Sequence, residues 1–262
     1  AAKVVHLEAQ GYRYKEEKAR MQNDTIFSLQ SMTKPIVSTA LMMLWEEGRF
    51  LLDDPISNWL PSYANKRVME DGHLVKARTV SVRHVLTHTS GLTLVADQPP
   101  SSENVMVSQP EAGAPGRGQP PAPNRAPRPA TLAEAIERAS PLPLNFQPGT
   151  RWQYGSSTDF VAILVEKMSG MTIDQFARER IFQPLGMVDT HYNIPKEKVG
   201  RVAAVYGPGP DQKITLLRKP EFREPTTYFP GVAGMNGTAA DYFRFCQMLL
   251  NGGELNGQRL LG

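Results

Sequence analysis

The chain has 262 residues, with 29 Lys and Arg against 26 Asp and Glu, a formal net charge of +3 and a sequence pI near 9.0. The basic residues are interspersed with acidic ones and form no run or stripe, which argues against nucleic-acid binding. No stretch of about eighteen apolar residues occurs, so no membrane span is expected, and the single Cys246 excludes an intrachain disulfide while leaving the compartment, cytoplasmic or periplasmic, undetermined.

The amino-terminal part of the chain predicts strands followed by helices, after a start that is too short and too quickly polar for a signal peptide. Residues 4–9 and 26–29 are expected to form the two strands of a hairpin. A mostly buried helix is expected over 35–47, where Gly48 suits its carboxyl end. Two shorter helices are expected after it, one from about 55 toward 60 and one over 82–87.

The middle of the chain contains a segment that cannot form a packed core. Half of the 22 prolines fall between Pro99 and Pro143, together with several glycines, so about 98–129 is expected to be a loop or flexible insertion. Regular structure is expected to resume at Thr131, which forms a capping-box pattern with Glu134. The remaining expected elements are helices over 131–138, 158–169, 173–182 and 238–250, and strands over 202–206 and 213–217.

Ser31 and Lys34 stand three residues apart just where the expected strand turns into the first long helix. Positions i and i+3 are neighbours on a helix, so the Lys34 amine can reach the Ser31 hydroxyl. Serine is a poor nucleophile unless a base takes its proton, and lysine serves as that base where burial or nearby positive charge lowers its pKa. The pair alone leaves a structural alternative open, in which Ser31 is a plain N-cap and Lys34 a solvated first-turn residue.

Four sequence strings, in this order, resemble the serine beta-lactamase and penicillin-binding-protein superfamily. They are DTIFSLQSMTKPI around Ser31, RHVLTHTSGL at 83–92, FQPGTRWQYGSS at 146–157 and IFQPLGMVDTHY at 181–192. The resemblance spans nearly the whole chain and is greatest to the class C beta-lactamase and family VIII carboxylesterase branch. It implies an α/β (α+β) fold of the beta-lactamase/transpeptidase type, with an antiparallel sheet flanked by helices and a mainly helical region.

The resemblance also implies roles for individual residues. Ser31 is expected to be the acylated nucleophile, Lys34 its partner base and Tyr154 the phenol that shares the proton transfer. A phenol beside a lysine exists partly as phenolate, so either group can accept the serine proton. Ser156 and the aromatic Trp152 are expected to contact the substrate. This acyl-enzyme chemistry requires neither a metal nor an organic cofactor.

Two departures from the family pattern bear on the substrate and on the extent of the chain. The second motif is usually Tyr-x-Asn, but here Ser156 stands in the asparagine position, so one hydroxyl replaces an amide and esters are favoured over lactams. The third motif, a Lys-Thr-Gly, Trp-Gly-Gly or His-x-Gly strand, normally follows a segment like 251–257 and is not reached before Gly262. The sequence is therefore expected to be a fragment that lacks carboxyl-terminal strands and an amino-terminal helix.

Two further patterns have simpler explanations than a ligand site. His84 and His88 are four residues apart, but no acidic or cysteine ligand accompanies them at the spacing of a metal site. The resemblance makes residues 88–91 a structural turn whose histidine is bonded to the backbone. Residues 231–234, Gly-Val-Ala-Gly, imitate a phosphate loop without its lysine and helix, so no nucleotide site is expected.

The expected organisation has three parts: residues 1–75 as the first part of an α/β region, 76–190 as a mainly helical region with the insertion at about 98–129, and 191–262 as an incomplete return to the α/β region. The expected function is hydrolysis of short-chain carboxylic esters through an acyl-enzyme on Ser31. Beta-lactamase or D-Ala-D-Ala peptidase activity is one alternative, and a penicillin-sensing or scaffold domain with little turnover is another. The expected partner is a small ester or amide, and the oligomeric state stays open.

Overall fold

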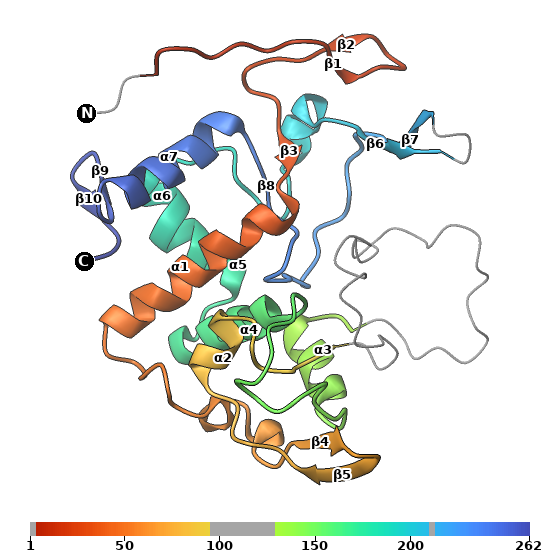
Figure 1. Ribbon diagram of the computed structural model, residues 1–262. Coiled ribbons are helices and arrows are strands. Elements are labelled where there is room, and N and C mark those ends of the chain that lie inside the picture. The colour runs from red at the N-terminus through yellow and green to blue at the C-terminus, as the bar shows by residue number, and fades with distance from the viewer. Residues whose placement is uncertain (1–3, 95–128, 210–212) are drawn as a thin grey trace. The chain divides into compact units, whose positions relative to one another are not determined.

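The computed structural model describes residues 4–94, 129–209 and 213–262 of the chain, which form two compact units (Figure 1). Unit 1 consists of Ala1–Met32, Ala177–Pro225 and Gly234–Gly262, and unit 2 consists of Thr33–Phe176 and Thr226–Ala233. The expected insertion at about 98–129 lies almost wholly outside the described residues. The three-part division expected from the sequence is a different one and stays a prediction.

Unit 2 is built around a buried helix. Helices α1 (Thr33–Glu46) and α4 (Ser157–Ser169) pack against each other, and α2 (Val82–Leu86) and α3 (Leu132–Ala139) also contact α4 (Figure 1). Because residues 157–165 of α4 are all buried, this helix forms the centre of the unit. The other elements that begin in unit 2 are the 3-10 helices η2 (Ile56–Asn58) and η3 (Pro61–Tyr63), the strands β4 (Arg67–Glu70) and β5 (His73–Lys76), and α5 (Ile173–Ala177).

Local signals set the helix ends much as the sequence predicts. Pro35 lies in the first turn of α1, where its missing N–H costs no helical hydrogen bond, and Gly48 follows the helix with a φ of 71°. The Thr131 hydroxyl accepts a hydrogen bond from the Glu134 N–H at 3.2 Å and so caps α3. Gly170, with a φ of 74°, ends α4. These boundaries confirm the predictions because each depends on residues only a few positions apart.

The Tyr63 side chain ties η3 to α3 and α4. Its hydroxyl donates to the Ile136 carbonyl at 2.6 Å, and its ring packs edge-on against Phe160 at 5.2 Å. We expect Tyr63→Phe to lower the free energy of unfolding by about 1–3 kcal/mol, because a buried carbonyl loses its donor while the ring contact is kept. Urea denaturation measures this change. Tyr12→Phe, at a tyrosine that is 40% exposed, is the control, and an equal loss there would contradict the prediction.

Unit 1 contains short antiparallel strand pairs and one longer helix, α7 (Ala239–Leu250). Strand β3 (Phe27–Ser28) pairs with β8 (Asn236–Gly237), which joins segments from near the two ends of the sequence. The other pairs are β1 (Tyr12–Tyr14) with β2 (Ala19–Arg20), β6 (Val205–Pro208) with β7 (Ile214–Arg218), and β9 (Glu254–Leu255) with β10 (Gln258–Arg259). The remaining helical elements are the 3-10 helices η1 (Gln30–Met32) and η6 (Lys196–Arg201), the π-helix η5 (Arg178–Phe182) and α6 (Gln183–Leu185).

The expected hairpin between residues 4–9 and 26–29 is wrong. Residues 4–10 form no strand, and β3 pairs with β8, more than two hundred positions away. Apolar content marks a strand but does not select its partner, which depends on packing elsewhere. A hairpin that the sequence analysis did not name joins β4 to β5 through Asp71 and Gly72, both with positive φ. That Asp-Gly pair is a strong hairpin signal and could have indicated it.

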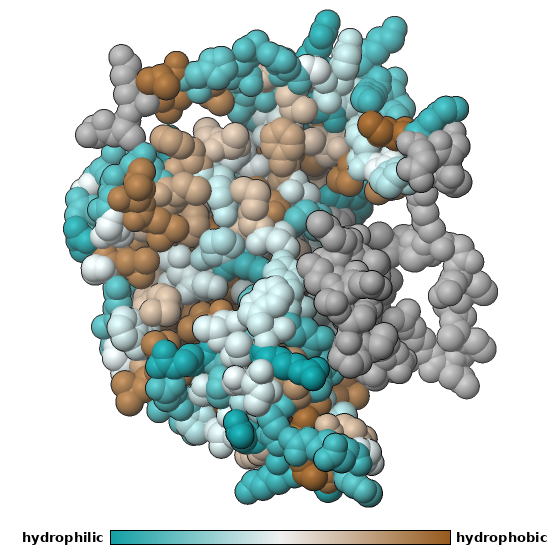
Figure 2. All heavy atoms as spheres, in the orientation of Figure 1, coloured by the Kyte–Doolittle hydropathy of each residue, from teal (hydrophilic) through white to brown (hydrophobic). Residues whose placement is uncertain are grey.

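Helix α7 presents apolar side chains on two sides. Phe245 and Met248 are buried, whereas Phe243, Leu249 and Leu250 are exposed. Figure 2 shows hydrophobic surface in the region of this helix. Within the described ranges, no helix of either unit is both long and apolar enough to cross a membrane.

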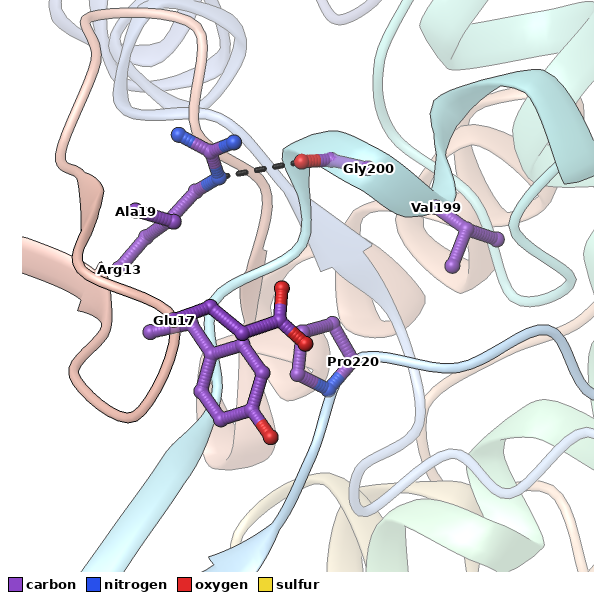
Figure 3. A pocket seen from close by; sticks show the side chains of 7 residues that line it. Arg13, Glu17, Ala19, Val199, Gly200 and Pro220 are labelled. Carbon is purple, nitrogen blue, oxygen red and sulfur yellow. Dashed lines mark hydrogen bonds between the residues drawn. The ribbon is translucent and has the colours of Figure 1, made fainter.

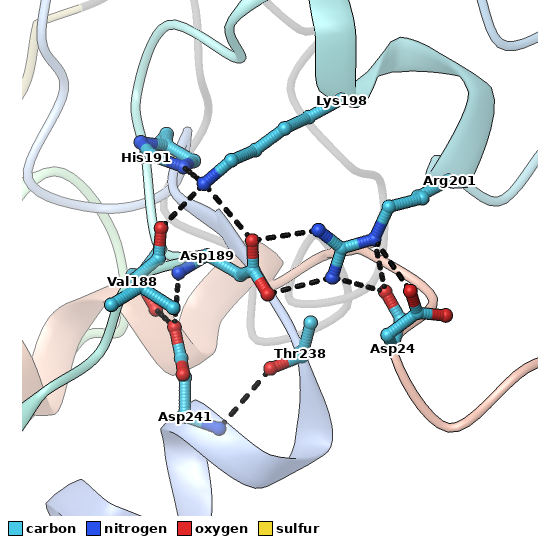
Figure 4. A network of polar contacts seen from close by, with 9 residues as sticks. Asp24, Val188, Asp189, His191, Lys198, Arg201, Thr238 and Asp241 are labelled. Carbon is cyan, nitrogen blue, oxygen red and sulfur yellow. Dashed lines mark hydrogen bonds and ion pairs between the residues drawn. The ribbon is translucent and has the colours of Figure 1, made fainter.

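A network of charged side chains holds the segment around η6 to its neighbours in unit 1 (Figure 4). The Arg201 guanidinium donates to both Asp189 carboxylate oxygens, at 2.9 and 2.6 Å, and Lys198 lies 3.0 Å from the same carboxylate. Asp241 accepts hydrogen bonds from the Asp189 N–H and from the Thr190 hydroxyl. The bidentate Arg201 contact holds the pKa of Asp189 at about 2. This carboxylate therefore stays ionised well into the acid range.

His191 makes the network sensitive to pH. Its Nε2 lies 3.1 Å from the Lys198 ammonium, and burial followed by that positive charge lowers the pKa of His191 to about 4. An unfolded histidine has a pKa of about 6.5, so the unfolded chain binds a proton that the folded chain does not. The free energy of unfolding should fall by on the order of 1–2 kcal/mol as pH decreases from about 6.5 to about 4, allowing for solvent screening.

The variant His191→Gln removes the titrating group and should flatten this part of the stability curve. Urea denaturation at several pH values between about 4 and 7 measures the slope. His73→Gln, at an exposed histidine of β5, is the matched control and should leave the slope as in the unmodified protein. An unchanged slope in His191→Gln would show that another group causes the loss.

Candidate active site

Ser31 lies in the 3-10 turn η1 of unit 1, directly after β3 and directly before α1 in the chain, and it is exposed. Two hydrogen bonds within unit 1 hold this turn. The Leu29 N–H donates to the Met235 carbonyl at 2.9 Å, and the Tyr242 hydroxyl donates to the carbonyl of the last turn residue at 3.1 Å. Gln30 has a φ of 47°, in the left-handed region that residues other than glycine rarely adopt. Such strain beside an exposed serine is typical of a functional position.

Lys34 lies in the first turn of α1, in unit 2, with its ammonium beside Tyr154. The Nζ atom donates to the Val232 carbonyl at 2.7 Å and lies 4.6 Å from the centroid of the Tyr154 ring. A cation over an aromatic face is attracted by the negative face of the ring. The fold of unit 2 therefore brings together two predicted site residues that are far apart in the sequence.

His88 and Trp152 extend this cluster, which we call the Lys34 cluster and define as Lys34, His88, Trp152 and Tyr154. The His88 ring stacks on Tyr154 with a centroid distance of 5.2 Å and an interplanar angle of 23°. The Trp152 ring lies 6.1 Å from His88 and 6.3 Å from Tyr154, and this residue is 63% exposed. The Gln153 N–H donates to the His88 carbonyl at 2.9 Å, which holds the strand-like segment 151–154 against the turn. An exposed aromatic face thus adjoins the amine and the phenol.

The His88 ring has unusual surroundings. Its Nδ1 atom is buried, and no group in the described part of the chain hydrogen-bonds to it. Burial, followed by the positive charge of Lys34, lowers the pKa of His88, so the imidazole is neutral at neutral pH. The family resemblance implies a histidine that is bonded to the backbone. That expectation holds for the His88 carbonyl, which accepts from the Gln153 N–H, and is wrong for the ring Nδ1 atom.

A buried carboxylate on α4 lies in the same unit as the Lys34 cluster and was not among the site residues predicted from the sequence. Asp159 is 4% exposed, and its Oδ1 accepts hydrogen bonds from the N–H groups of Gly231 at 2.8 Å and Val232 at 3.1 Å. Burial raises the pKa of Asp159 to about 6, against the lowering effect of these hydrogen bonds and of the Lys34 charge. The available signal was a carboxylate directly before the apolar run of residues 160–165 in α4. The first two residues of the Gly-Val-Ala-Gly pattern at 231–234 therefore donate their N–H groups to a carboxylate of the protein itself.

Ser156 is the N-cap residue of α4 and follows Tyr154 by two positions. The residue is partly exposed. The predicted contact between Ser156 and a substrate stays a prediction. The structure thus places Lys34, Tyr154 and Trp152 in one cluster of unit 2, with Ser156 next along the chain, and places Ser31 in the turn that ends the first segment of unit 1.

A hollow of about 130 Å³ in unit 1 contains none of the predicted site residues (Figure 3). The Arg13 guanidinium at its edge donates to the Gly200 carbonyl at 3.0 Å and to the Arg20 carbonyl at 2.6 Å. These donors already serve the backbone and brace the amino-terminal hairpin against η6. The hollow is lined by Arg13, Tyr14, Glu17, Ala19, Val199, Gly200 and Pro220.

Comparisons with known proteins agree on one family. The family model described as Beta-lactamase matches residues 1–262. Protein Rv1367c of Mycobacterium tuberculosis is 31% identical over 99% of this chain, and Esterase EstB of Burkholderia gladioli is 29% identical over 92% of it. The chain spans 62% and 61% of these two relatives' own lengths. The solved structure of EstCE1, described as a hydrolase with promiscuous acyltransferase activity, aligns with a TM-score of 0.72 at 24% identity, covering 96% of this chain and 65% of that one.

Proposed function

Because this chain belongs to the Beta-lactamase family, we propose that it is a serine hydrolase that forms an acyl-enzyme on Ser31 and turns over short-chain carboxylic esters. Its fold is the mixed α/β fold of beta-lactamases and penicillin-binding proteins. The observation that carries the proposal is the contact between Lys34 and Tyr154. The Lys34 ammonium, on the helix that follows Ser31 in the chain, lies 4.6 Å from the centroid of the Tyr154 ring. Nucleophilic catalysis needs groups of this kind to move the serine proton.

Acylation in this proposal begins when Lys34 or the Tyr154 phenolate accepts the Ser31 hydroxyl proton. The Ser31 oxygen then forms a bond to the ester carbonyl carbon, and a tetrahedral intermediate develops negative charge on the carbonyl oxygen. When the intermediate collapses, the bond to the alcohol oxygen breaks, and the proton passes from Lys34 or Tyr154 to that oxygen. The alcohol leaves, and the acyl group remains on Ser31.

Deacylation repeats the same transfers with water in place of serine. Tyr154 accepts a proton from the water, whose oxygen attacks the acyl carbon, and the bond to the Ser31 oxygen breaks. Ser31 regains a proton from Tyr154 or Lys34, and the carboxylic acid leaves. The neutral His88 ring, stacked on Tyr154, would keep the phenol in a fixed plane during both steps. Every proton taken is returned, so the chemistry needs no cofactor.

Three features support an ester as the preferred substrate. By the resemblance of its motifs, Ser156 stands in the asparagine position of the Tyr-x-Asn pattern, so an acylamino side chain would have fewer hydrogen-bond partners. The exposed Trp152 ring offers an apolar face beside Tyr154 for a short acyl or alkoxy group. The similarity to a protein named Esterase EstB also agrees with this substrate class.

Parallel incubations with a chromogenic acetate ester and a chromogenic cephalosporin test the proposal. We expect sustained ester turnover, slow or absent cephalosporin turnover, and a transient mass increase of one acetyl group in intact-mass measurements. A persistent cephalosporin adduct without ester turnover would replace the proposal by the penicillin-sensing alternative. Faster hydrolysis of the cephalosporin than of the ester would favour the beta-lactamase alternative, and no reaction with either compound would contradict an acyl-enzyme function.

A further inference from the structure

We propose that Asp159 is a positioning residue for Lys34 and acts through the backbone of Gly231 and Val232. The inference rests on the proposed function, because it concerns the amine that takes the serine proton. A chain of hydrogen bonds within unit 2 carries it: the Asp159 carboxylate accepts from two successive backbone N–H groups, and the carbonyl that follows them accepts from the Lys34 ammonium at 2.7 Å. The carboxylate thus fixes the peptide segment that holds the amine.

The geometry gives this chain of contacts little freedom. One oxygen, Oδ1 of Asp159, receives both N–H groups, at 2.8 and 3.1 Å, so the turn is held at two successive residues. Hydrogen bonds to an ionised acceptor are stronger than neutral ones. Because the orientation of a peptide carbonyl follows from the dihedral angles of its own residue, fixing the N–H groups of Gly231 and Val232 also directs the Val232 carbonyl. The Lys34 ammonium is bound at that carbonyl.

Gly231 is required for the turn to approach α4 this closely. A Cβ atom at this position would lie 2.1 Å from the Thr158 carbonyl oxygen and 2.9 Å from the Ala162 Cβ. Backbone atoms cannot move aside as a flexible side chain can, so any larger residue would push the turn away from Asp159. The sequence therefore combines a buried acid on α4 with a glycine on the facing turn, and both are needed for the contact.

The competing explanation is that Asp159 only stabilises the fold. A substitution at a second carboxylate on α4 distinguishes this structural role from the positioning role. Glu166 is partly buried, and its Oε1 accepts the Ile173 N–H at 3.0 Å. The Ile173 N–H belongs to the amino end of α5, outside the Lys34 cluster. Removing the Glu166 carboxylate should therefore weaken the fold of unit 2 without displacing the Lys34 amine.

The experiment compares Asp159→Ala, Asp159→Asn and Glu166→Ala in the complete chain, under conditions where circular dichroism shows each variant folded. Steady-state kinetics with a chromogenic acetate ester give kcat and KM, and intact-mass measurements give the rate at which a fluorophosphonate labels Ser31. We expect Asp159→Ala to lower kcat and the labelling rate by about 10–100-fold with a much smaller change in KM, because a displaced catalytic group slows the chemical step. Asp159→Asn should recover most of both rates, because its amide oxygen accepts the same two N–H groups. Glu166→Ala should stay near the wild-type kcat.

Gly231→Ala disturbs the same contact with the Asp159 carboxylate, but from the side of the turn. This variant replaces Asp159→Ala in the experiment if Asp159→Ala does not fold. It should lower kcat and the labelling rate as Asp159→Ala does, whereas Gly200→Ala, where an added Cβ meets no atom within 4 Å, should leave both unchanged. Wild-type rates in Asp159→Ala, or equal losses in Asp159→Asn and Asp159→Ala, would overturn the inference and leave the proposed function intact. Turnover and labelling that persist in Ser31→Ala would instead overturn the proposed function.

Discussion

Replacing Ser31 by alanine should abolish ester turnover and the acyl adduct together. The proposed mechanism forms its only covalent bond between protein and substrate at the Ser31 oxygen, and removal of a nucleophile in such enzymes lowers kcat by about 10⁴-fold or more. Ser31 is exposed in a turn, and its hydroxyl can be removed without opening a cavity in the core. The melting temperature should therefore stay close to that of the unmodified protein. Initial rates with a chromogenic acetate ester and intact-mass measurements check both parts of the prediction.

Ser62→Ala is the matched control for this substitution. Ser62 is an exposed serine in η3 whose hydroxyl donates to the Glu137 carboxylate at 2.9 Å, so the change removes the same atom from another part of the chain. We expect turnover in Ser62→Ala to stay within about twofold of the wild type. If Ser31→Ala kept its activity, or if peptide mapping found the acyl group on another side chain, Ser31 would not be the nucleophile.

Replacing Tyr154 by phenylalanine should slow catalysis by about 10²–10⁴-fold, the usual contribution of a general acid or base. The substitution keeps the ring that stacks on His88 and lies beneath the Lys34 ammonium, and it removes only the hydroxyl. KM should change little, because the aromatic surface next to Trp152 is retained. If Tyr154 activates the attacking water, the acyl-enzyme should accumulate in this variant and be visible as a persistent mass increase.

Tyr63→Phe provides the control for the loss of a tyrosine hydroxyl in unit 2. The two variants should behave in opposite ways: Tyr63→Phe should lose stability and keep kcat, whereas Tyr154→Phe should keep stability and lose kcat. Rapid-quench measurements separate the acylation burst from the steady-state rate. A wild-type kcat in Tyr154→Phe would remove the phenol from the mechanism and leave Lys34 as the proton carrier.

The neutral His88 ring departs from ordinary protein geometry in two ways. Its buried Nδ1 atom has no partner in the described residues, and a buried polar atom in this condition costs about 1–3 kcal/mol. The backbone of His88 also has a positive φ of 57°, which is a second departure from ordinary geometry at this residue. Both features are consistent with a position that function, and not stability, maintains.

Much of the local structure followed from the sequence because its causes lie within a few residues. The caps of α3 and α4, the glycine that ends α1 and the Pro35 position each depend on neighbours in the chain, and they match the predictions. The predicted helix over 173–182 is divided between α5 and the π-helix η5. Helical periodicity marks such a region without distinguishing these two hydrogen-bond patterns.

The family, the mixed α/β fold and the Ser31–Lys34 spacing could be predicted, because they are properties of motifs and of near neighbours along the chain. The strand pairing and the groups around Lys34 could not be predicted, because they depend on tertiary packing. Strand β3 finds its partner near the other end of the sequence, and Asp159 reaches Lys34 through a turn more than seventy residues further on. Contacts of this kind depend on how buried surfaces fit together in space, and no spacing between residues in the sequence specifies them.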